Sequence, residues 1–464
     1  MPEWLMLRMP MITTAIFVFA VGACVGSLIN VVVYRMPLGL DVVRPTSRCP
    51  SCGTKLTWRE NIPILGWVFL GGRCRFCQAR ISPEYPIVEL IVAVLFGGVF
   101  LLWYMTPPDF VALGIPLGAI APEWAGNGAS RTWPAFVVTI TLLGSLVAMT
   151  IVDARTCTIP LVLCWIPAAV ALMGHVGHAV WIEAAYATPR AIQPGTWAVG
   201  RLRWETAAGE VWTLATGGLE GRRFVGTAIG GVIGLGVSNL LLAKGLITRS
   251  FADYEVWESE AIESARSAES AAGGDTSGAS REASESPADL WIQYPFARRE
   301  MVRELAFLAP VVGLGLFGGW IAARTAGQTV IGADGGLVPP APMPLWLTVL
   351  GAVLMGYLIG GGVVWAIRIL GTAAFGKEAM GLGDVHLMAA VGACIGWADA
   401  VLAFFGAAFV GILVTFYSLS LSRGVGRAMP YGPSLAIATV LVLLFKPAIE
   451  LGLSRMTGQV INLP

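Results

Sequence analysis

Two aspartates, 231 positions apart, have neighbours that suit acid–base chemistry. Asp384 follows the glycine-rich run GKEAMGLG and precedes an apolar stretch, and Asp153 follows the apolar stretch that ends in AMTIV. Two carboxylates placed together in a low-dielectric site cannot both ionise, so one of them retains a proton. Such a pair can act as general base on a water molecule and as general acid toward a leaving amine, as in aspartic proteases. Gly381 and Gly383 would let a substrate backbone approach Asp384 closely.

Each aspartate also has a structural interpretation of equal weight when position alone is considered. Asp384 directly precedes a predicted helix and could cap its N-terminus, a role worth about 1 kcal/mol. Asp153 could pair with Arg155 at the level of the lipid headgroups. An acid at a membrane edge is a functional hypothesis by default, but a lone G-x-G-D is a weak pattern.

Four of the eight cysteines form two C-x-x-C pairs with 21 residues between them, namely Cys49, Cys52, Cys74 and Cys77. This spacing in a basic loop is typical of a closed tetrathiolate zinc site, with iron or a redox role as less favoured alternatives. We expect the loop on the reducing cytoplasmic side, where structural disulfides are rare. A closed site leaves no open position for a water, so its predicted role is to fold a loop that is short of core residues.

The elements that must position these residues belong to a membrane protein. Hydrophobic residues make up 56% of the 464 and charged residues 13%, against roughly 25% charged in an average soluble domain. We predict an all-α polytopic membrane protein with about eight to ten transmembrane helices and a small cytoplasmic zinc-knuckle loop built on the four cysteines. Residues 11–34 have the features of a full span, so we expect no cleavable signal peptide. The apolar stretches predicted to cross the membrane are 12–34, 86–105, 134–152, 160–182, 224–246, 305–323, 345–370, 385–400, 402–421 and 430–447.

The positions of lysine and arginine predict the orientation in the membrane. Residues 35–84 carry eight of them, whereas the loop 106–133 carries only Arg131, which predicts a cytoplasmic cysteine loop. Counting spans from this loop places both chain ends outside and brings Asp153 and Asp384 to the same cytoplasmic edge. The loop 183–223 disagrees, because it holds five arginines and falls on the outer side.

One further segment differs from the rest of the chain. Residues 251–290 contain ten acidic side chains and two arginines in a background of serine, alanine, glutamate and glycine. Burial of the few apolar groups in this segment cannot offset the conformational entropy lost on ordering. We therefore predict a disordered cytoplasmic insertion that serves as a spacer.

Several motifs together resemble those of the type IV prepilin peptidases, also called leader peptidases. They are GKEAMGLGDVHLMAAVGACIG, VDARTCTIP, the N-terminal FVFAVGACVGSLINVVVYRMP with the NIP and YPIVEL landmarks after it, and MPYGPSLAIA at 429–438. The resemblance covers about 12–182 and 345–447. It implies that Asp153 and Asp384 are a catalytic dyad that needs no metal. It also implies cleavage of type IV prepilin or pseudopilin leaders, just after a glycine, at the cytoplasmic boundary of a bacterial inner membrane.

The resemblance divides the chain into four parts. Residues 1–105 hold the first two spans and the cysteine loop (35–85), and 134–182 begin the peptidase domain with Asp153. Residues 345–447 complete that domain with the G-x-G-D, and 183–344 form an atypical insertion with extra spans. Two positions depart from the family: Leu161 follows Pro160 where an aspartate is usual, and His386 stands where a lysine is common. We expect His386 to be a polar residue near a helix start, although it could change the local electrostatics.

The resemblance also implies a second activity, N-methylation of the new amino terminus with S-adenosylmethionine. No nucleotide-binding glycine fingerprint is visible, so the cofactor rests wholly on the resemblance and its binding residues are unassigned. A peptidase without methylation and a non-catalytic scaffold or transporter component are the alternatives. Prepilins, pseudopilins and lipid are the expected partners, in pilus assembly or type II secretion, and nucleic acid is not.

For Glu89 we prefer headgroup-level pairing with Arg80 or Arg75 over a role in receiving the substrate's amine.

Overall fold

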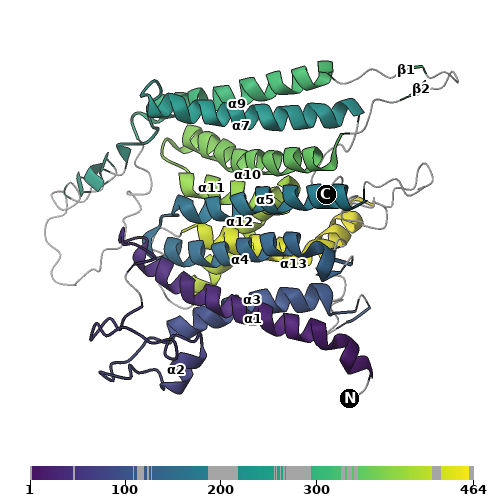
Figure 1. The fold of residues 1–464 in the computed structure, drawn as a ribbon. Coiled ribbons are helices and arrows are strands. Elements are labelled where there is room, and N and C mark those ends of the chain that lie inside the picture. Colours follow the sequence, from purple (N-terminus) through teal and green to yellow (C-terminus); the bar gives the residue numbers. More distant parts are fainter. Residues whose placement is uncertain are drawn as a thin grey trace.

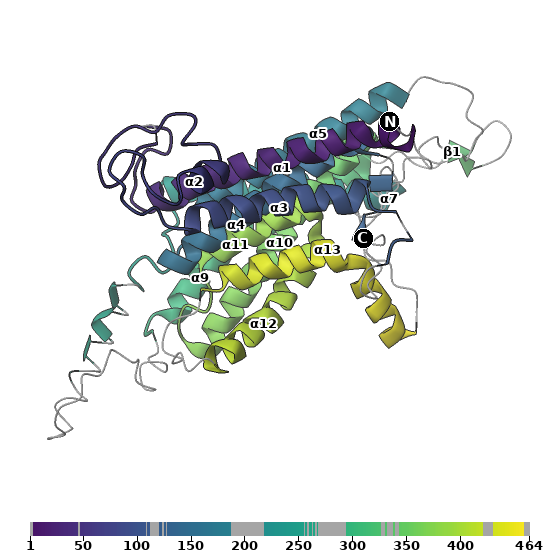
Figure 2. The same ribbon diagram turned by 90° about the horizontal axis from the view of Figure 1, so that it is seen from below.

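A computed structural model gives the fold as a bundle of long, roughly parallel helices (Figures 1 and 2). The structure describes residues 3–458 except 45–46, 108, 112–119, 123–124, 127, 187–217, 255, 258, 262, 265–266, 268–293, 326–329, 332–336, 339–342 and 421–429. The helices are α1 (Glu3–Arg35), α2 (Leu65–Phe69), α3 (Glu84–Tyr104), α4 (Ala129–Thr156), α5 (Leu161–Tyr186), α7 (Gly218–Ala243), α9 (Ala297–Thr325), α10 (Leu345–Phe375), α11 (Leu382–Ile395), α12 (Trp397–Ser420) and α13 (Gly432–Thr457). Strands β1 (Val330–Ile331) and β2 (Leu337–Val338) pair antiparallel, with Val330 opposite Val338.

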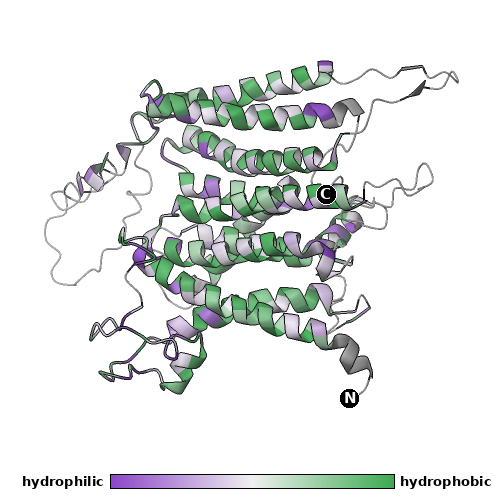
Figure 3. Ribbon diagram, in the orientation of Figure 1, coloured by the Kyte–Doolittle hydropathy of each residue, from purple (hydrophilic) through white to green (hydrophobic). Residues whose placement is uncertain are grey.

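The prediction of an all-α polytopic membrane protein is confirmed. Among the described residues, eight helices are long and apolar enough to cross a membrane, and α13 makes a ninth if its two halves form one span. α13 bends by 78° near Phe445, whose backbone is not helical. Apolar residues cover the middle of the bundle, and hydrophilic residues gather toward the helix ends and the loops (Figure 3). The chain is therefore a multi-pass membrane protein.

The predicted span 385–400 was wrong in its boundaries and length. α11 has 14 residues and ends at Ile395. The next residue, Gly396, has a φ of +97°, which is left-handed backbone that favours glycine. Fourteen residues rise about 21 Å, less than a hydrocarbon core of about 30 Å. The apolar run is thus divided at Gly396, before α12, and not at residue 401.

The ends of the helices sort into two groups. The start of α1 and the end of α13 lie at one end of the bundle, and the cysteine loop lies at the other (Figures 1 and 2). α4 runs toward the cysteine-loop end and α11 starts from it, so both aspartate-bearing helix ends lie there. The predicted loop 183–223 falls largely on residues 187–217, which lie outside the described residues.

Close backbone packing joins α10 to α11. A Cβ atom added to either Gly356 or Gly392 would collide with the carbonyl group of the other, so only glycine permits this approach. The extra helices α7 and α9 pack on each other and α7 lies beside α10 (Figure 1). α11 is therefore held by α10, which in turn is flanked by the additional pair.

The prediction of disorder over 251–290 was wrong at its start. Phe251 and Tyr254 are buried and form a small apolar cluster with Tyr294 and Ala297. Their aromatic rings supply apolar area that the acidic composition of the segment as a whole conceals. Residues 268–293 lie outside the described residues.

Candidate active site and cysteine cluster

Asp153 lies in the last turn of α4 and is buried, with 5% of its surface exposed. Its Oδ2 accepts a hydrogen bond of 3.0 Å from the backbone N–H of Gly432, the first residue of α13. Arg155 pairs instead with Glu84, at the start of α3. The alternative in which Asp153 pairs with Arg155 is therefore wrong.

Asp384 lies in the first turn of α11 and is also buried, at 9% exposure. The residue that caps this helix is Gly381, whose backbone is extended, and no side chain makes the capping hydrogen bond. The interpretation of Asp384 as the N-terminal cap is therefore wrong. The charges of Asp153 and Arg368 lie near enough to the Asp384 carboxylate to act on it electrostatically.

Ile159 joins the two aspartate-bearing segments. A Cβ atom added to Gly383 would lie 2.9 Å from Ile159 Cβ, and one added to Gly432 would lie 3.3 Å from Ile159 Cδ1. The same added atom on Gly432 would lie 2.5 Å from Asp153 Oδ2. The structure thus brings together three segments far apart in sequence: the end of α4, the G-x-G-D turn and the start of α13.

The two predicted substrate-approach glycines have different surroundings. Gly381 is exposed, and the nearest atoms to an added Cβ, 3.9 Å away, include Asp384 Oδ2. Gly383 packs against Ile159, so its lack of a side chain serves the contact between segments. His386 is partly buried, two residues after Asp384. Access of a substrate backbone at Gly381 stays a prediction.

Gly432 is the site residue that sequence reasoning missed. It belongs to MPYGPSLAIA, whose resemblance to a family landmark was visible, but nothing in the sequence connects it to Asp153 279 positions earlier. Its neighbour Tyr431 lies near enough to Asp384 for an electrostatic interaction. The glycine–proline pair at the start of α13 was the signal that a helix end, with free N–H groups, reaches this site.

The four predicted cysteines come together in the loop between α1 and α3. Their sulfur atoms all lie within 4.8 Å of one another, and those of Cys49 and Cys77 are 3.8 Å apart. A tetrahedral site with Zn–S bonds of about 2.3 Å has sulfurs roughly 3.8 Å apart, so the four thiols fit zinc with a small contraction.

The two knuckles have the same backbone pattern. The N–H of Cys49 donates to Thr54 O and that of Cys74 donates to Ala79 O, at 3.0 and 2.9 Å. Each turn contains a residue with positive φ at the same position, Gly53 in one knuckle and Gln78 in the other. Such matched turns present both sulfurs of each pair to one point.

Local hydrogen bonds change the acidity of these thiols. Hydrogen bonds with the hydroxyl group and the backbone of Thr54 lower the pKa of the Cys52 thiol to about 6. The Ala79 N–H lowers the pKa of the Cys77 thiol, but burial and the neighbouring sulfurs have the larger, opposite effect. The pKa of Cys77 is raised to about 11 as a result. Four thiols this close cannot all be thiolates without a cation, which is what a bound metal would supply.

Glu89 does not pair with either predicted arginine. It is buried on α3, where it accepts a hydrogen bond of 2.6 Å from the backbone N–H of Ile64 and another from Ser27. Arg75 pairs with Glu60. The preferred interpretation of Glu89 as a headgroup-level residue was therefore wrong; it fixes the cysteine loop to α1 and α3.

Comparison with known proteins matches two parts of this architecture. Residues 20–103 match the bacterial peptidase A24 N-terminal domain, and residues 311–416 match the type IV leader peptidase family. Over these two segments, the chain is similar to leader peptidases. The first match contains the cysteine loop and the second contains the G-x-G-D. The second begins within α9, inside the region 183–344 that we expected to be atypical, and Asp153 lies outside both.

Curated relatives carry matching names. A "Prepilin leader peptidase/N-methyltransferase" of Myxococcus xanthus is 55% identical over 82 residues, 18% of this chain and 24% of the relative. A protein of the same name from Klebsiella pneumoniae is 42% identical over 104 residues, 21% of this chain and 44% of the relative. Another from Vibrio cholerae is 36% identical over 103 residues, 20% of this chain and 41% of the relative. The chain matches less than half the length of these relatives. No solved structure matches.

Proposed function

We propose that this protein is a membrane-embedded aspartic endopeptidase that cleaves the leader of type IV prepilins or pseudopilins. The observation that carries the proposal is that the segments of Asp153 and Asp384, both buried, come together at Ile159. The match of residues 311–416 to the leader peptidase family supports this substrate class. A scaffold would not need two buried carboxylates whose charges act on each other.

In the proposed mechanism the two carboxyl groups share one proton. The ionised member takes a proton from a water, whose oxygen attacks the scissile carbonyl carbon, and the protonated member donates to the leaving amine. The hydrogen bond from Gly432 N–H favours the charged form of Asp153, so we assign Asp153 as the initial base and Asp384 as the initial acid. These steps are carried by the two carboxyl groups and the water.

The position of the site in the bundle suits a substrate that is itself a membrane helix. Both aspartates lie at the helix ends on the side of the cysteine loop, which the basic residues of 35–84 predict to be cytoplasmic. A prepilin with a short basic leader outside the membrane and an apolar helix within it presents its junction at this depth. Cleavage just after the glycine of that junction follows from the family resemblance.

The relatives' names support N-methylation of the new amino terminus as a second activity. S-adenosylmethionine would supply the methyl group. In the cysteine loop, Cys49, Cys52, Cys74 and Cys77 would hold zinc, which would stabilise the loop without entering the chemistry. A bacterial cytoplasmic membrane is the proposed location.

Co-expression with a prepilin from the same genome tests both activities. The mass of the pilin amino terminus should decrease by the leader and increase by one methyl group. An uncut prepilin in cells that contain inserted wild-type protein would refute the peptidase, and a cut but unmethylated pilin would remove only the methyltransferase.

A further inference from the structure

A buried charged network lies next to the G-x-G-D turn. At its centre is Arg368 on α10, whose side chain is 0% exposed. Its acidic partner Glu304, on α9, is 2% exposed and lies outside both segments that match the family models. A buried arginine needs compensating charge, because an unpaired one is strongly destabilising.

The guanidinium of Arg368 connects α9 to the turn. Its Nε donates a hydrogen bond of 2.6 Å to Glu304 Oε1, and its Nη1 donates to Glu378 and to the backbone carbonyl of Met380. Met380 precedes Asp384 by four residues. The planar fork of an arginine fixes direction as well as distance, so Glu304 determines where Arg368 holds this carbonyl.

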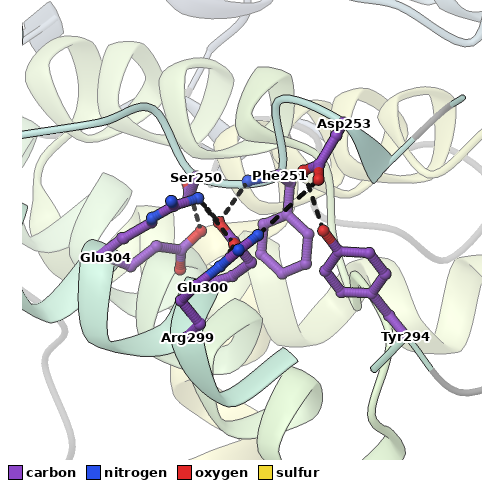
Figure 4. A network of polar contacts seen from close by, with 8 residues as sticks. Ser250, Phe251, Asp253, Tyr294, Arg299, Glu300 and Glu304 are labelled. Carbon is purple, nitrogen blue, oxygen red and sulfur yellow. Dashed lines mark hydrogen bonds and ion pairs between the residues drawn. The ribbon is translucent and has the colours of Figure 1, made fainter. Parts of the chain in front are cut away.

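Glu304 and its neighbour Glu300 are held by the chain at the start of the acidic segment 251–290 (Figure 4). The hydroxyl of Ser250 donates to Glu304 Oε1 at 3.1 Å, and the backbone N–H of Phe251 donates to Glu300 Oε2 at 3.0 Å. The Phe251 ring lies against the Arg368 guanidinium, 4.9 Å from its centroid. The described start of the segment predicted as disordered is therefore part of the support.

A second contact holds the other end of the turn. The backbone N–H of Tyr294 donates a hydrogen bond of 2.7 Å to the carbonyl of Gly376, the left-handed residue that ends α10. The Tyr294 hydroxyl donates to Asp253 Oδ1 at 2.9 Å. Tyr294 thus holds the first residue of the 376–380 connection directly, and Glu304 acts on the last residue through Arg368.

We propose that residues 250–254 and 294–304 are a positioning element for Asp384 and act on it through Arg368. This inference rests on the proposed peptidase. Glu304 and Arg368 are positioning residues: they do not touch the substrate, but they fix the turn from which Asp384 reaches the peptide bond. Displacement of a reacting group by about 1 Å can lower a rate by about 10²-fold, so loss of this support should act on kcat.

The test measures cleavage of a purified prepilin by the full-length protein in detergent, with kcat expressed per folded molecule from size-exclusion chromatography. Glu304→Gln removes the counter-charge, and Arg368→Lys retains the charge but loses the fork. Glu260→Gln, the same change at an exposed residue of the insertion, is the matched control. We expect both test variants to lower kcat about tenfold or more with KM within about twofold, and the control to match wild type.

The other results would overturn the inference. An unchanged kcat per folded molecule, even with a lower folded yield, would mean that the network only stabilises the protein. A change confined to KM would mean that it acts on substrate binding. If Glu304→Gln gives no folded protein, Arg368→Lys decides by the same criterion, and loss of folded protein in both assigns a purely structural role. A wild-type protein that does not cleave would refute the proposed function instead.

Discussion

Substitution of Gly432 by alanine tests the geometry around Asp153. The added Cβ would lie 2.5 Å from Asp153 Oδ2, whereas an ordinary contact begins at 3.4 Å, so the carboxylate or the start of α13 must move by about 0.9 Å. The hydrogen bond from Gly432 N–H would lengthen with it. A hydrogen bond to a charged group is worth about 1.5–3 kcal/mol, which is roughly a tenfold to hundredfold change.

We therefore expect Gly432→Ala to lower kcat for prepilin cleavage by roughly 10- to 100-fold. The assay follows conversion of purified prepilin on a gel, with the amino terminus identified by mass. Gly452→Ala is the matched control, because it lies on the same helix and an added Cβ there meets no atom within 4 Å. Wild-type kcat in folded Gly432→Ala would refute the view that Gly432 positions Asp153.

Two further predictions concern the scaffold. Gly392→Ala should destabilise the protein by about 1–3 kcal/mol, because the added Cβ has no space against Gly356, and the melting temperature in detergent should fall. Gly362→Ala is the control, because an added Cβ there lies in open space and should leave the melting temperature unchanged. Equal effects of the two substitutions would contradict the proposed packing. Elemental analysis should find one zinc ion per chain in the wild-type protein. Cys74→Ser should lose this zinc, whereas Cys24→Ser should retain it. Zinc retained by Cys74→Ser would refute the tetrathiolate site.

Much of the fold could be predicted because membrane spans follow from local composition. Apolar stretches predicted the long helices of the bundle, and glycines predicted their close packing. The orientation expected from the basic residues stays a prediction. The short helix α11 failed at Gly396, where a single positive φ divides one apolar run, and hydropathy does not report backbone conformation. Topology predicted that Asp153 and Asp384 lie at the same end of the bundle, since helix ends on one side must lie at one depth. Their pairing as a dyad came from the family resemblance.

What the sequence could not predict depends on contacts between distant residues. The hydrogen bond from Gly432 to Asp153, and the burial of Glu89 beneath the cysteine loop, join parts of the chain that no local pattern connects. The ordered start of the acidic segment was hidden for a related reason. Phe251 and Tyr254 are few among many polar residues, and they form a cluster because Tyr294 and Ala297, far along the chain, pack against them.

The most direct measurement compares Asp153→Asn and Asp384→Asn with Asp109→Asn, an exposed aspartate, in membranes that contain equal amounts of each protein. Prepilin cleavage is followed by the mass of the pilin amino terminus. The asparagine variants retain the size of the side chain but cannot share a proton, so each should cleave at least about 10³-fold more slowly, while Asp109→Asn cleaves as wild type does. Cleavage at the wild-type rate by either dyad variant would contradict the assignment of these two residues.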